Sequence, residues 1–207
     1  MKRQAIIPVV VAIAFIGIFV TANTAQASLL TNPSFADVDT NGSFGDGWSS
    51  FGNAGFNAFF GGGNGHVSLF ADNPGNSGGV FQLGIPATPN TTYRFSLTDN
   101  FFEANFDGTV QVGLEYYLAD DSTKVGEDIT SITSFTSSFS VFGTSVADAE
   151  IVRPIILFQG GTNQGSSDNA FFFEAELVVI PEPATLSLLG VAGVALLRRY
   201  RSVRGLV

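Results

Sequence analysis

The sequence predicts an all-β protein, and we expect the central part of the chain to fold as a β-sandwich. Three observations indicate this class. Apolar and polar residues alternate in short runs, clusters of Gly, Asn, Asp and Ser separate these runs, and the 3.6-residue period of a helix is missing between the two chain ends. Alternation with a period of two is typical of a strand with one buried face. Several such strands joined by turns favour a sandwich or a barrel.

The expected strands follow one another from the middle of the chain to its C-terminal quarter. They are residues 66–71, 78–84, 91–99, 108–119, 131–142, 150–158 and 170–180. The alternation is clearest in two of them. Tyr93, Phe95 and Leu97 are separated by polar residues, and Val110 and Val112 begin the same pattern. We expect these apolar side chains to face the core.

Residues 1–27 have the pattern of a secretory signal peptide. Two basic residues precede an apolar run of 16 residues, which ends before a small-residue site formed by Ala25 and Ala27. Cleavage after Ala27 would make Ser28 the first residue of the mature protein. The alternative is an uncleaved membrane anchor, because the apolar run approaches the length that spans a bilayer.

Residues 184–197 form a second apolar segment, 14 residues long and without charge, followed by Arg198, Arg199 and Arg201. As a helix it would be about 21 Å long, which is shorter than the roughly 30 Å of the hydrocarbon core. The alternative is a buried helix of the globular domain. Because the segment is apolar on all sides and ends in arginines, we interpret it as a single transmembrane helix.

The charges divide sharply along the chain. Residues 28–183 contain three basic and 18 acidic residues, a formal charge of −15, whereas both ends are basic. Because basic flanks of a membrane segment stay in the cytoplasm, we expect the acidic domain on the outer side of the membrane. The acidic surface argues against nucleic acid as a partner. Cysteine is absent, so the domain must be stable without disulfides.

A proline pair stands between the acidic domain and the apolar segment. Pro181 and Pro183 flank Glu182. Proline removes a backbone donor and disfavours helix in the residue before it, so this triplet is expected to be extended and unpaired. Such a segment suits an enzyme that must grip the chain, although a plain rigid spacer is the alternative.

The triplet 181–183, the helix 184–197 and the basic tail 198–204 together resemble the PEP-CTERM sorting signal of exosortase substrates, which here covers residues 180–204. The resemblance implies a Gram-negative envelope protein that is exported and held transiently in the inner membrane. An exosortase would then cleave it near the triplet, so that the domain reaches the cell surface or the medium. The family is associated with exopolysaccharide and biofilm.

The domain 28–179 has a weaker resemblance of its own. The stretches "LLTNPSFADVDTNGSFGDGW" (29–48) and "GGVFQLGIPATPNTTYRFSL" (78–97) are similar to two landmarks of carbohydrate-binding jelly-roll modules. The resemblance implies a jelly-roll-like sandwich and glycan as a ligand. In the last expected strand, Glu174 and Glu176 stand where such modules usually carry Asp, so a calcium site does not follow from it.

The loop "GDGWSSFG" holds the residues that we single out for ligand binding, Trp48 and Asp46. A sandwich that binds sugar would present an exposed aromatic ring beside hydrogen-bonding groups. Trp48 is the only tryptophan of the chain, so it is the first candidate for such a ring. The alternative is that Trp48 closes one end of the core.

Catalysis has little support in the sequence, and we expect no enzymatic activity and no cofactor. The only histidine is His66, at the start of an expected strand, so neither a catalytic triad nor a zinc site is indicated. A glycosidase would need two facing carboxylates. The candidates are Glu103, Asp107, Glu115, Glu174 and Glu176.

Calcium is the metal that the loops could hold. Asp37, Asp39 and Asn41 offer hard oxygen ligands at every other position, but the glycine and the downstream glutamate of an EF-hand loop are missing. We therefore leave a structural calcium ion open. The sequence favours an exported, non-enzymatic surface or matrix protein, with a carbohydrate-binding module as the alternative.

Overall fold

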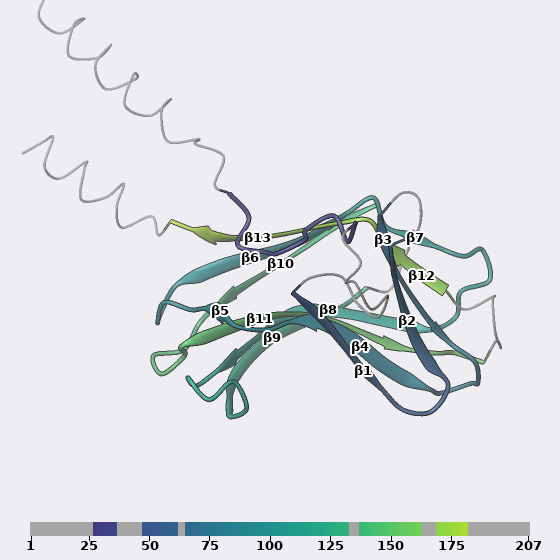
Figure 1. Ribbon diagram of the computed structural model, residues 1–207, viewed down its shortest axis with the longest axis horizontal. Coiled ribbons are helices and arrows are strands. Elements are labelled where there is room, and N and C mark those ends of the chain that lie inside the picture. Colours follow the sequence, from purple (N-terminus) through teal and green to yellow (C-terminus); the bar gives the residue numbers. More distant parts are fainter. Residues whose placement is uncertain (1–26, 37–46, 62–64, 133–136, 163–168, 182–207) are drawn as a thin grey trace, which may run out of the picture.

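The computed structural model describes residues 27–36, 47–61, 65–132, 137–162 and 169–181, and their regular secondary structure consists of strands alone (Figure 1). The strands are β1 Trp48–Gly52, β2 Phe56–Gly61, β3 His66–Ala71, β4 Ser77–Gln82, β5 Ile85–Pro86, β6 Thr92–Thr98, β7 Phe101–Phe102, β8 Thr109–Tyr117, β9 Lys124–Ile132, β10 Ser138–Thr144, β11 Ile151–Gln159, β12 Asn169–Phe172 and β13 Glu174–Ile180. The all-β prediction is confirmed for this part of the chain.

One layer is a six-stranded antiparallel sheet, which we call the large sheet. Its order is β1-β4-β11-β8-β9, and the short β5 pairs with β11. The longest register joins β11 to β8, from Ile151 opposite Tyr117 to Gln159 opposite Thr109. This register places residues 34 to 50 positions apart in the chain opposite one another.

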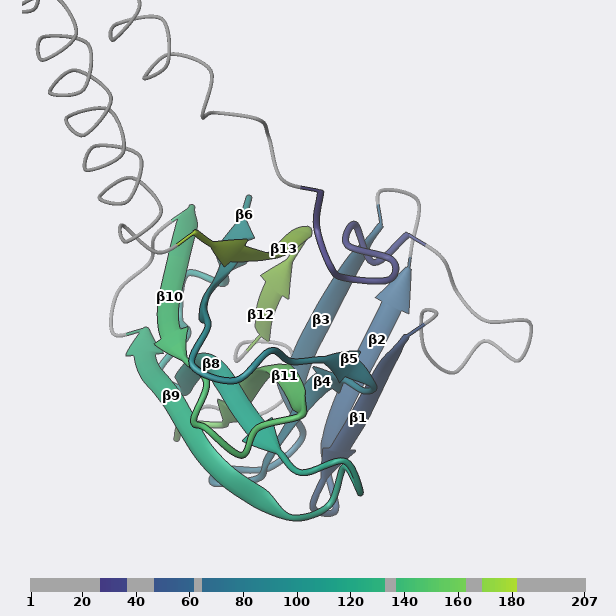
Figure 2. The same ribbon diagram turned by 90° about the vertical axis from the view of Figure 1, so that its left-hand side faces the viewer.

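The second layer is built from two sheets, with the orders β10-β6-β13 and β2-β3-β12-β7. The same two chain segments meet in both, because β6 pairs with β13 and β7 pairs with β12. Only a short break separates the halves of each segment, at residues 99–100 and at Phe173. The two sheets are therefore halves of one bent layer that faces the large sheet, and the architecture is a β-sandwich (Figure 2).

The bend of the second layer has a local cause on the β6–β7 side. Asp99 has a φ of 55°, in the left-handed region that Asp and Asn adopt more readily than most residues. The turn interrupts the strand, and the buried Asn100 follows it, with its side-chain amide donating to the carbonyl of Leu97.

The N-terminal segment runs along the outer edge of β13. The Leu29 amide donates to the Leu177 carbonyl over 2.8 Å, and the Ala175 amide donates to the Pro33 carbonyl over 2.7 Å. The pairing is antiparallel, so the chain enters the domain beside the point where β13 leaves it. In Figure 1 the purple segment follows the yellow-green strand. The edge of β13 is thereby covered, and both chain ends of the domain lie together.

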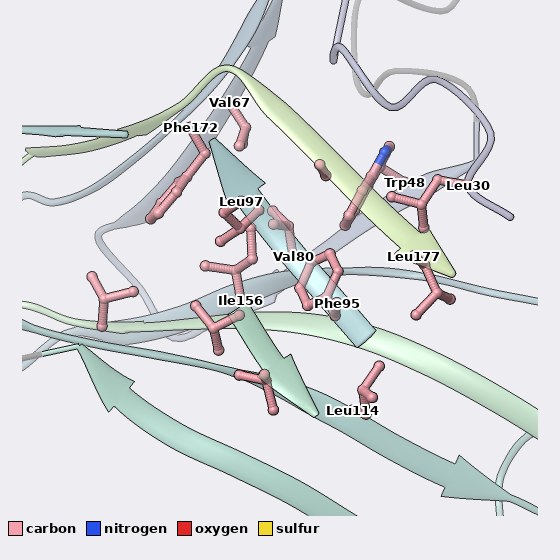
Figure 3. Packing of buried hydrophobic residues seen from close by; sticks show 14 of the residues in the cluster. Leu30, Trp48, Val67, Val80, Phe95, Leu97, Leu114, Ile156, Phe172 and Leu177 are labelled. Atoms are coloured by element: carbon pink, nitrogen blue, oxygen red, sulfur yellow. The ribbon is translucent and has the colours of Figure 1, made fainter. Parts of the chain in front are cut away.

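The core fills the space between the layers, where buried side chains such as Val80, Phe95 and Ile156 gather (Figure 3). Tyr93, Phe95 and Leu97 are each at most 1% exposed, and Val110 and Val112 are fully buried, as the alternation predicted. Burial of each large apolar side chain contributes about 1.5–3 kcal/mol. This core lets the domain stand without disulfides.

Two expected strands differ from the observed ones. Residues 131–142, expected as one strand, contain the end of β9 in the large sheet and the start of β10 in the second layer. Residues 170–180 are divided at Phe173 into β12 and β13. In both cases the apolar pattern continues while the chain changes its partner strands, and periodicity does not register such a change.

Neither chain end can be compared with its predicted helix. Residues 1–26 and 182–207 lie outside the described residues, and with them the expected signal peptide and the segment 184–197. Within the ranges that are described, the structure has no helix long and apolar enough to cross a bilayer.

Candidate functional site

The outward face of the large sheet carries the candidate site, and we call it the outer face. On β8 the partly exposed Gln111 stands between the buried Val110 and Val112, so it points away from the core. The pairing register extends this face across the neighbouring strands. One row runs from Phe51 through Gly79 and Leu157 to Gln111.

A hollow of about 530 Å³ opens at one end of the outer face. The side chains that shape it come from β1, β4, β8 and β11. They are Phe51, Ser77, Thr109, Gln111, Leu157 and Gln159. Gln159 lies opposite both Ser77 and Thr109 in the ladder, so the polar side chains gather at this end of the sheet.

Phe51 presents its ring at the wall of the hollow, and Gly79 makes room for it. A Cβ at position 79 would lie 3.0 Å from two carbons of the Phe51 ring and 2.5 Å from the carbonyl oxygen of Ile156. The ring therefore lies over the bare backbone of β4. It packs against Phe81 at a centroid distance of 5.8 Å, yet Phe51 remains 44% exposed.

Amide and hydroxyl groups surround this ring. The Gln111 side-chain amide donates to the hydroxyl of Ser131 over 3.2 Å, while Gln159 is exposed. Ser77 is fixed through its backbone amide, which donates to the Asn53 side chain over 2.9 Å. Primary amides and hydroxyls both donate and accept hydrogen bonds, as sugar hydroxyls do. An exposed ring beside such groups is suited to a sugar.

The other end of the outer face holds a charged cluster. The Arg153 guanidinium lies 4.0 Å from the ring centre of Tyr117 and 4.8 Å from that of Phe81. Its Nη2 donates to the Asp121 carboxylate and to the Asp121 carbonyl, each over 2.8 Å. The two rings and the carboxylate hold this cation in one place.

Lys124 completes the charged cluster. Its Nζ lies 3.2 Å from Glu115 and 2.7 Å from Glu127, and the Tyr117 hydroxyl donates to Glu115 over 2.8 Å. Burial and the bond to Glu115 raise the pKa of Tyr117 to about 12, and the bond to Glu127 is the main cause that raises the pKa of Lys124 to about 12. Both groups therefore keep their protons far above neutral pH, and neither serves there as a base.

Trp48 is not the exposed ring of this site. It is 3% exposed, its ring packs on Phe35 at 4.9 Å between centroids, and its indole nitrogen donates to the Asn32 carbonyl over 3.2 Å. Figure 3 shows it within the core cluster, beside Leu30. This packing corresponds to the alternative in which Trp48 closes one end of the sandwich. Asp46 lies outside the described residues.

The carboxylates that a glycosidase could use are dispersed over the two layers. Glu115 lies in the large sheet, bonded to Tyr117 and Lys124, whereas Glu174 and Glu176 lie on β13 of the second layer. Glu176 pairs with Arg94 over 2.6 Å. Asp107 binds the amide of Thr162 in a loop, and Glu103 lies in the turn after β7, so none of them faces Glu115 across the outer face.

His66 lies on the second layer among aromatic rings. The ring centres of Phe173, Phe171 and Phe59 are 5.4, 5.8 and 6.3 Å away. Burial lowers the pKa of the imidazole, which is therefore neutral at pH 7. Among the residues that the structure describes, those around His66 offer neither a nucleophile nor a second metal ligand.

Several other residues that the sequence singled out lie outside the described residues. Asp37, Asp39 and Asn41, the candidates for calcium, belong to this group. In the parts of the chain that are described, no three His, Asp or Glu residues come together in a way that could hold a metal ion. Ala27 and Pro181 stand at the two limits of the described domain, and Ala25, Glu182, Pro183 and the arginines lie beyond them.

Comparison with known proteins identifies a sorting motif in the C-terminal segment. Residues 179–202 match the PEP-CTERM protein-sorting motif. No curated protein matches the sequence. The prediction of a sorting signal is thus confirmed at the level of the motif, for a segment that makes up a small part of the chain.

Solved structures of low sequence identity share the fold of the domain. The enzymatically active domain of tailspike protein 4 of bacteriophage CBA120 aligns with a TM-score of 0.54 and 11% identity over 74% of this chain and 21% of that chain. The CBM22-1–GH10 modules of endo-1,4-β-D-xylanase 10B from Clostridium thermocellum, complexed with xylohexaose, align with a TM-score of 0.50 and 8% identity. This alignment covers 76% of this chain and 29% of that chain. The Stig cyclase Fisc from Fischerella sp. TAU aligns with a TM-score of 0.50 and 15% identity, over 76% of this chain and 99% of that chain. At these identities the likeness shows the fold alone, and two of the three proteins are much longer than this chain.

Proposed function

We propose that this chain is an exported surface or extracellular-matrix protein without enzymatic activity, which an exosortase processes through residues 180–204, and that its sandwich binds glycan at the hollow of the outer face. The match of residues 179–202 to the PEP-CTERM protein-sorting motif carries the first part. The half-exposed ring of Phe51 beside amide and hydroxyl groups carries the second.

The sorting pathway assigns a role to each end of the chain. Residues 1–27 direct export and are removed after Ala27, which leaves the domain 28–179 outside a Gram-negative inner membrane. Residues 184–197 anchor it there transiently, Arg198, Arg199 and Arg201 stop the helix in the cytoplasm, and the exosortase cleaves near Pro181, Glu182 and Pro183. The hydrogen bond between Leu29 and Leu177 supports this topology, because it lets both ends of the domain face the same membrane.

Glycan binding would give the released domain a task at the surface. Exopolysaccharide of the biofilm is the natural candidate ligand of an exported protein with this sorting signal. One structure of similar fold is complexed with xylohexaose, which makes linear glycans the first ligands to test. The hollow with Phe51 replaces the loop of Trp48 as the proposed site, since the faces of the Trp48 ring are covered by protein.

Mass spectrometry of the protein at the cell surface tests the sorting proposal. We expect a chain that starts at Ser28 and ends near Pro183. A surface form that retains Arg198 and the residues after it would refute processing by an exosortase. As a control, replacing Pro181 and Pro183 by alanine should leave the protein in the inner membrane with its C-terminus intact.

Native affinity electrophoresis in gels that contain soluble polysaccharides tests the glycan site. We expect at least one polysaccharide to retard the protein, and Phe51→Ala to abolish the retardation while circular dichroism stays unchanged. Phe142→Ala is the matched control, because Phe142 is 60% exposed on β10 of the second layer. Retardation that survives in Phe51→Ala and disappears in Phe142→Ala would place the site on the opposite layer.

A further inference from the structure

We infer that the glycan bound at the outer face is neutral, with hydroxyl groups and no carboxylate or sulfate groups as its polar partners. The inference rests on the proposed glycan site and adds the chemical class of its ligand. Two observations support it together. The hollow is lined with amides and hydroxyls, and the two cations of the same face are both bound by carboxylates of the protein.

Cations are scarce in this domain, and each of them is paired. Residues 28–183 contain only Arg94, Lys124 and Arg153 as basic residues. Arg94 lies on the second layer, 2.6 Å from Glu176. On the outer face, Arg153 is 2.8 Å from Asp121, and Lys124 contacts two carboxylates.

Arg153 has little capacity left for a ligand. Its side chain is 12% exposed, and the rings of Tyr117 and Phe81 both lie within 5 Å of the guanidinium. Its Nη2 is engaged by Asp121 and its Nε is buried, so an anionic sugar could reach the guanidinium only by drawing it out from between the rings. That movement would lose the stacking and strain the contact with Asp121.

Lys124 is more exposed, at 44%, but it lies at the wrong end of the face. It pairs in register with Tyr117, whereas the hollow begins at Gln111 on the same strand β8. Six residues of strand correspond to about 20 Å. This separation exceeds the Debye length of about 8 Å at physiological ionic strength, so Lys124 does not attract a ligand in the hollow.

The polar groups of the hollow fit hydroxyls better than anions. The polar side chains of the hollow can each donate or accept a hydrogen bond, and a sugar hydroxyl can do the same. They are the amides of Gln111 and Gln159 and the hydroxyls of Ser77 and Thr109. A carboxylate only accepts, so it could use only the donor hydrogens of these side chains and not their acceptor oxygens. The formal charge of −15 for residues 28–183 adds a general repulsion of anionic polymers.

The experiment compares each polysaccharide with its carboxymethylated form, in which carboxymethyl ethers replace some of the hydroxyls. The full chain in mild detergent is titrated with xylan, galactan, mannan and a β-glucan, each beside its carboxymethylated form, and binding is measured by calorimetry. We expect a neutral polymer to bind and its carboxymethylated form to bind more weakly. The difference should shrink between about 20 mM and about 500 mM NaCl, because salt screens the repulsion.

The outcomes separate this inference from the proposed site. Equal or tighter binding of the carboxymethylated form, lost in Phe51→Ala, would overturn the neutral class and leave the glycan site standing. Absence of binding to every polymer would refute the glycan site and the inference together. Binding of the neutral form alone, lost in Phe51→Ala and kept in Phe142→Ala, would support both.

A charge variant tests the cause of the preference. Glu127→Gln removes one of the two carboxylates that engage Lys124, on a residue whose side chain is 49% exposed. Because Lys124 lies about 20 Å from the hollow, the affinity for the carboxymethylated polymer should rise in Glu127→Gln by no more than the small gain that follows from the change in net charge. Glu174→Gln, on the second layer, is the matched control for that change. A gain in Glu127→Gln several times larger than in Glu174→Gln would show that Lys124 reaches the ligand and would overturn the argument from distance.

Discussion

The ring of Phe51 lies over Gly79 of the neighbouring strand, so close that a Cβ at position 79 would stand 3.0 Å from two of its carbons. The two residues are directly opposite in the ladder between β1 and β4. The missing side chain is what allows the ring to lie along the sheet beside the hollow. The geometry of the candidate site thus depends on a residue that contributes no atom of its own to a ligand.

Gly79→Ala is therefore expected to damage both the site and the domain. The new methyl group would meet the Ile156 carbonyl at 2.5 Å as well as the Phe51 ring. Overpacking of this kind costs about 1–3 kcal/mol. Urea unfolding should show this loss, and affinity electrophoresis should show glycan binding reduced as in Phe51→Ala. Gly126→Ala is the control, since a Cβ there meets only the tip of Val146 at 3.2 Å and the Tyr116 ring at 3.4 Å. An unchanged stability and affinity in Gly79→Ala would contradict this account of the Phe51 ring.

Trp48 offers a test that separates stability from binding. Trp48→Ala would leave a large void beside Phe35 and should destabilise the domain by about 3–5 kcal/mol. Trp48→Phe keeps much of the ring volume and removes only the hydrogen bond to Asn32 with part of the packing. We expect this milder variant to lose stability in urea unfolding while its affinity for glycan stays the same. A stable Trp48→Phe protein that no longer binds would return the site to the Trp48 loop.

The sequence predicted the sandwich because its core strands carry strict alternation, as in Tyr93 to Leu97. It did not predict β1, β2 or β9. The strands "WSSFG" and "KVGEDITSI" have few apolar residues, and in "FNAFFG" two adjacent Phe residues blur the alternation. These strands lie at the edges of their sheets, where one side has no partner strand and the demand for apolar residues is weaker.

The candidate site could not be predicted from the sequence because its residues are far apart in the chain. Phe51, Gly79, Leu157 and Gln111 meet through three strand pairings, which join residues up to 78 positions apart, as between Gly79 and Leu157. Local patterns carry no information on such registers. The sequence favoured Trp48 because it is the only tryptophan. In the structure Trp48 lies opposite Gln82 and faces the core, whereas Phe51, three residues later on the same strand, faces outward.

Breaking the ion pair between Arg153 and Asp121 should lower the stability of the domain and leave glycan binding at the hollow unchanged. The side chains of the pair are 12% and 25% exposed, and Asp121 also accepts a bond at its carbonyl from the same guanidinium nitrogen. Asp121→Asn would leave the charge of Arg153 without its carboxylate and should cost about 1–3 kcal/mol in chemical unfolding. Asp148→Asn, at an exposed loop carboxylate, is the control and should cost less than about 0.5 kcal/mol. Equal stability of the two variants would show that the stacking on Tyr117 and Phe81 alone holds Arg153.

Because of His66, we expect the free energy of unfolding of the domain to fall as the pH is lowered. The imidazole lies among Phe59, Phe171 and Phe173, its Nδ1 is buried without a hydrogen-bond partner in the described structure, and burial lowers its pKa below the model-compound value of 6.5. The unfolded chain therefore binds this proton more tightly than the folded domain does, so stability rises with pH in this range. The contribution is fully present above pH 6.5 and is lost as the pH falls through the lower pKa of the folded state. Urea midpoints measured between about pH 7.5 and about pH 5 should fall more for the natural protein than for His66→Phe, whose carboxylates titrate alike. Proton NMR of the imidazole gives the independent readout, and a His66 pKa at or above 6.5 in the folded protein would contradict the prediction.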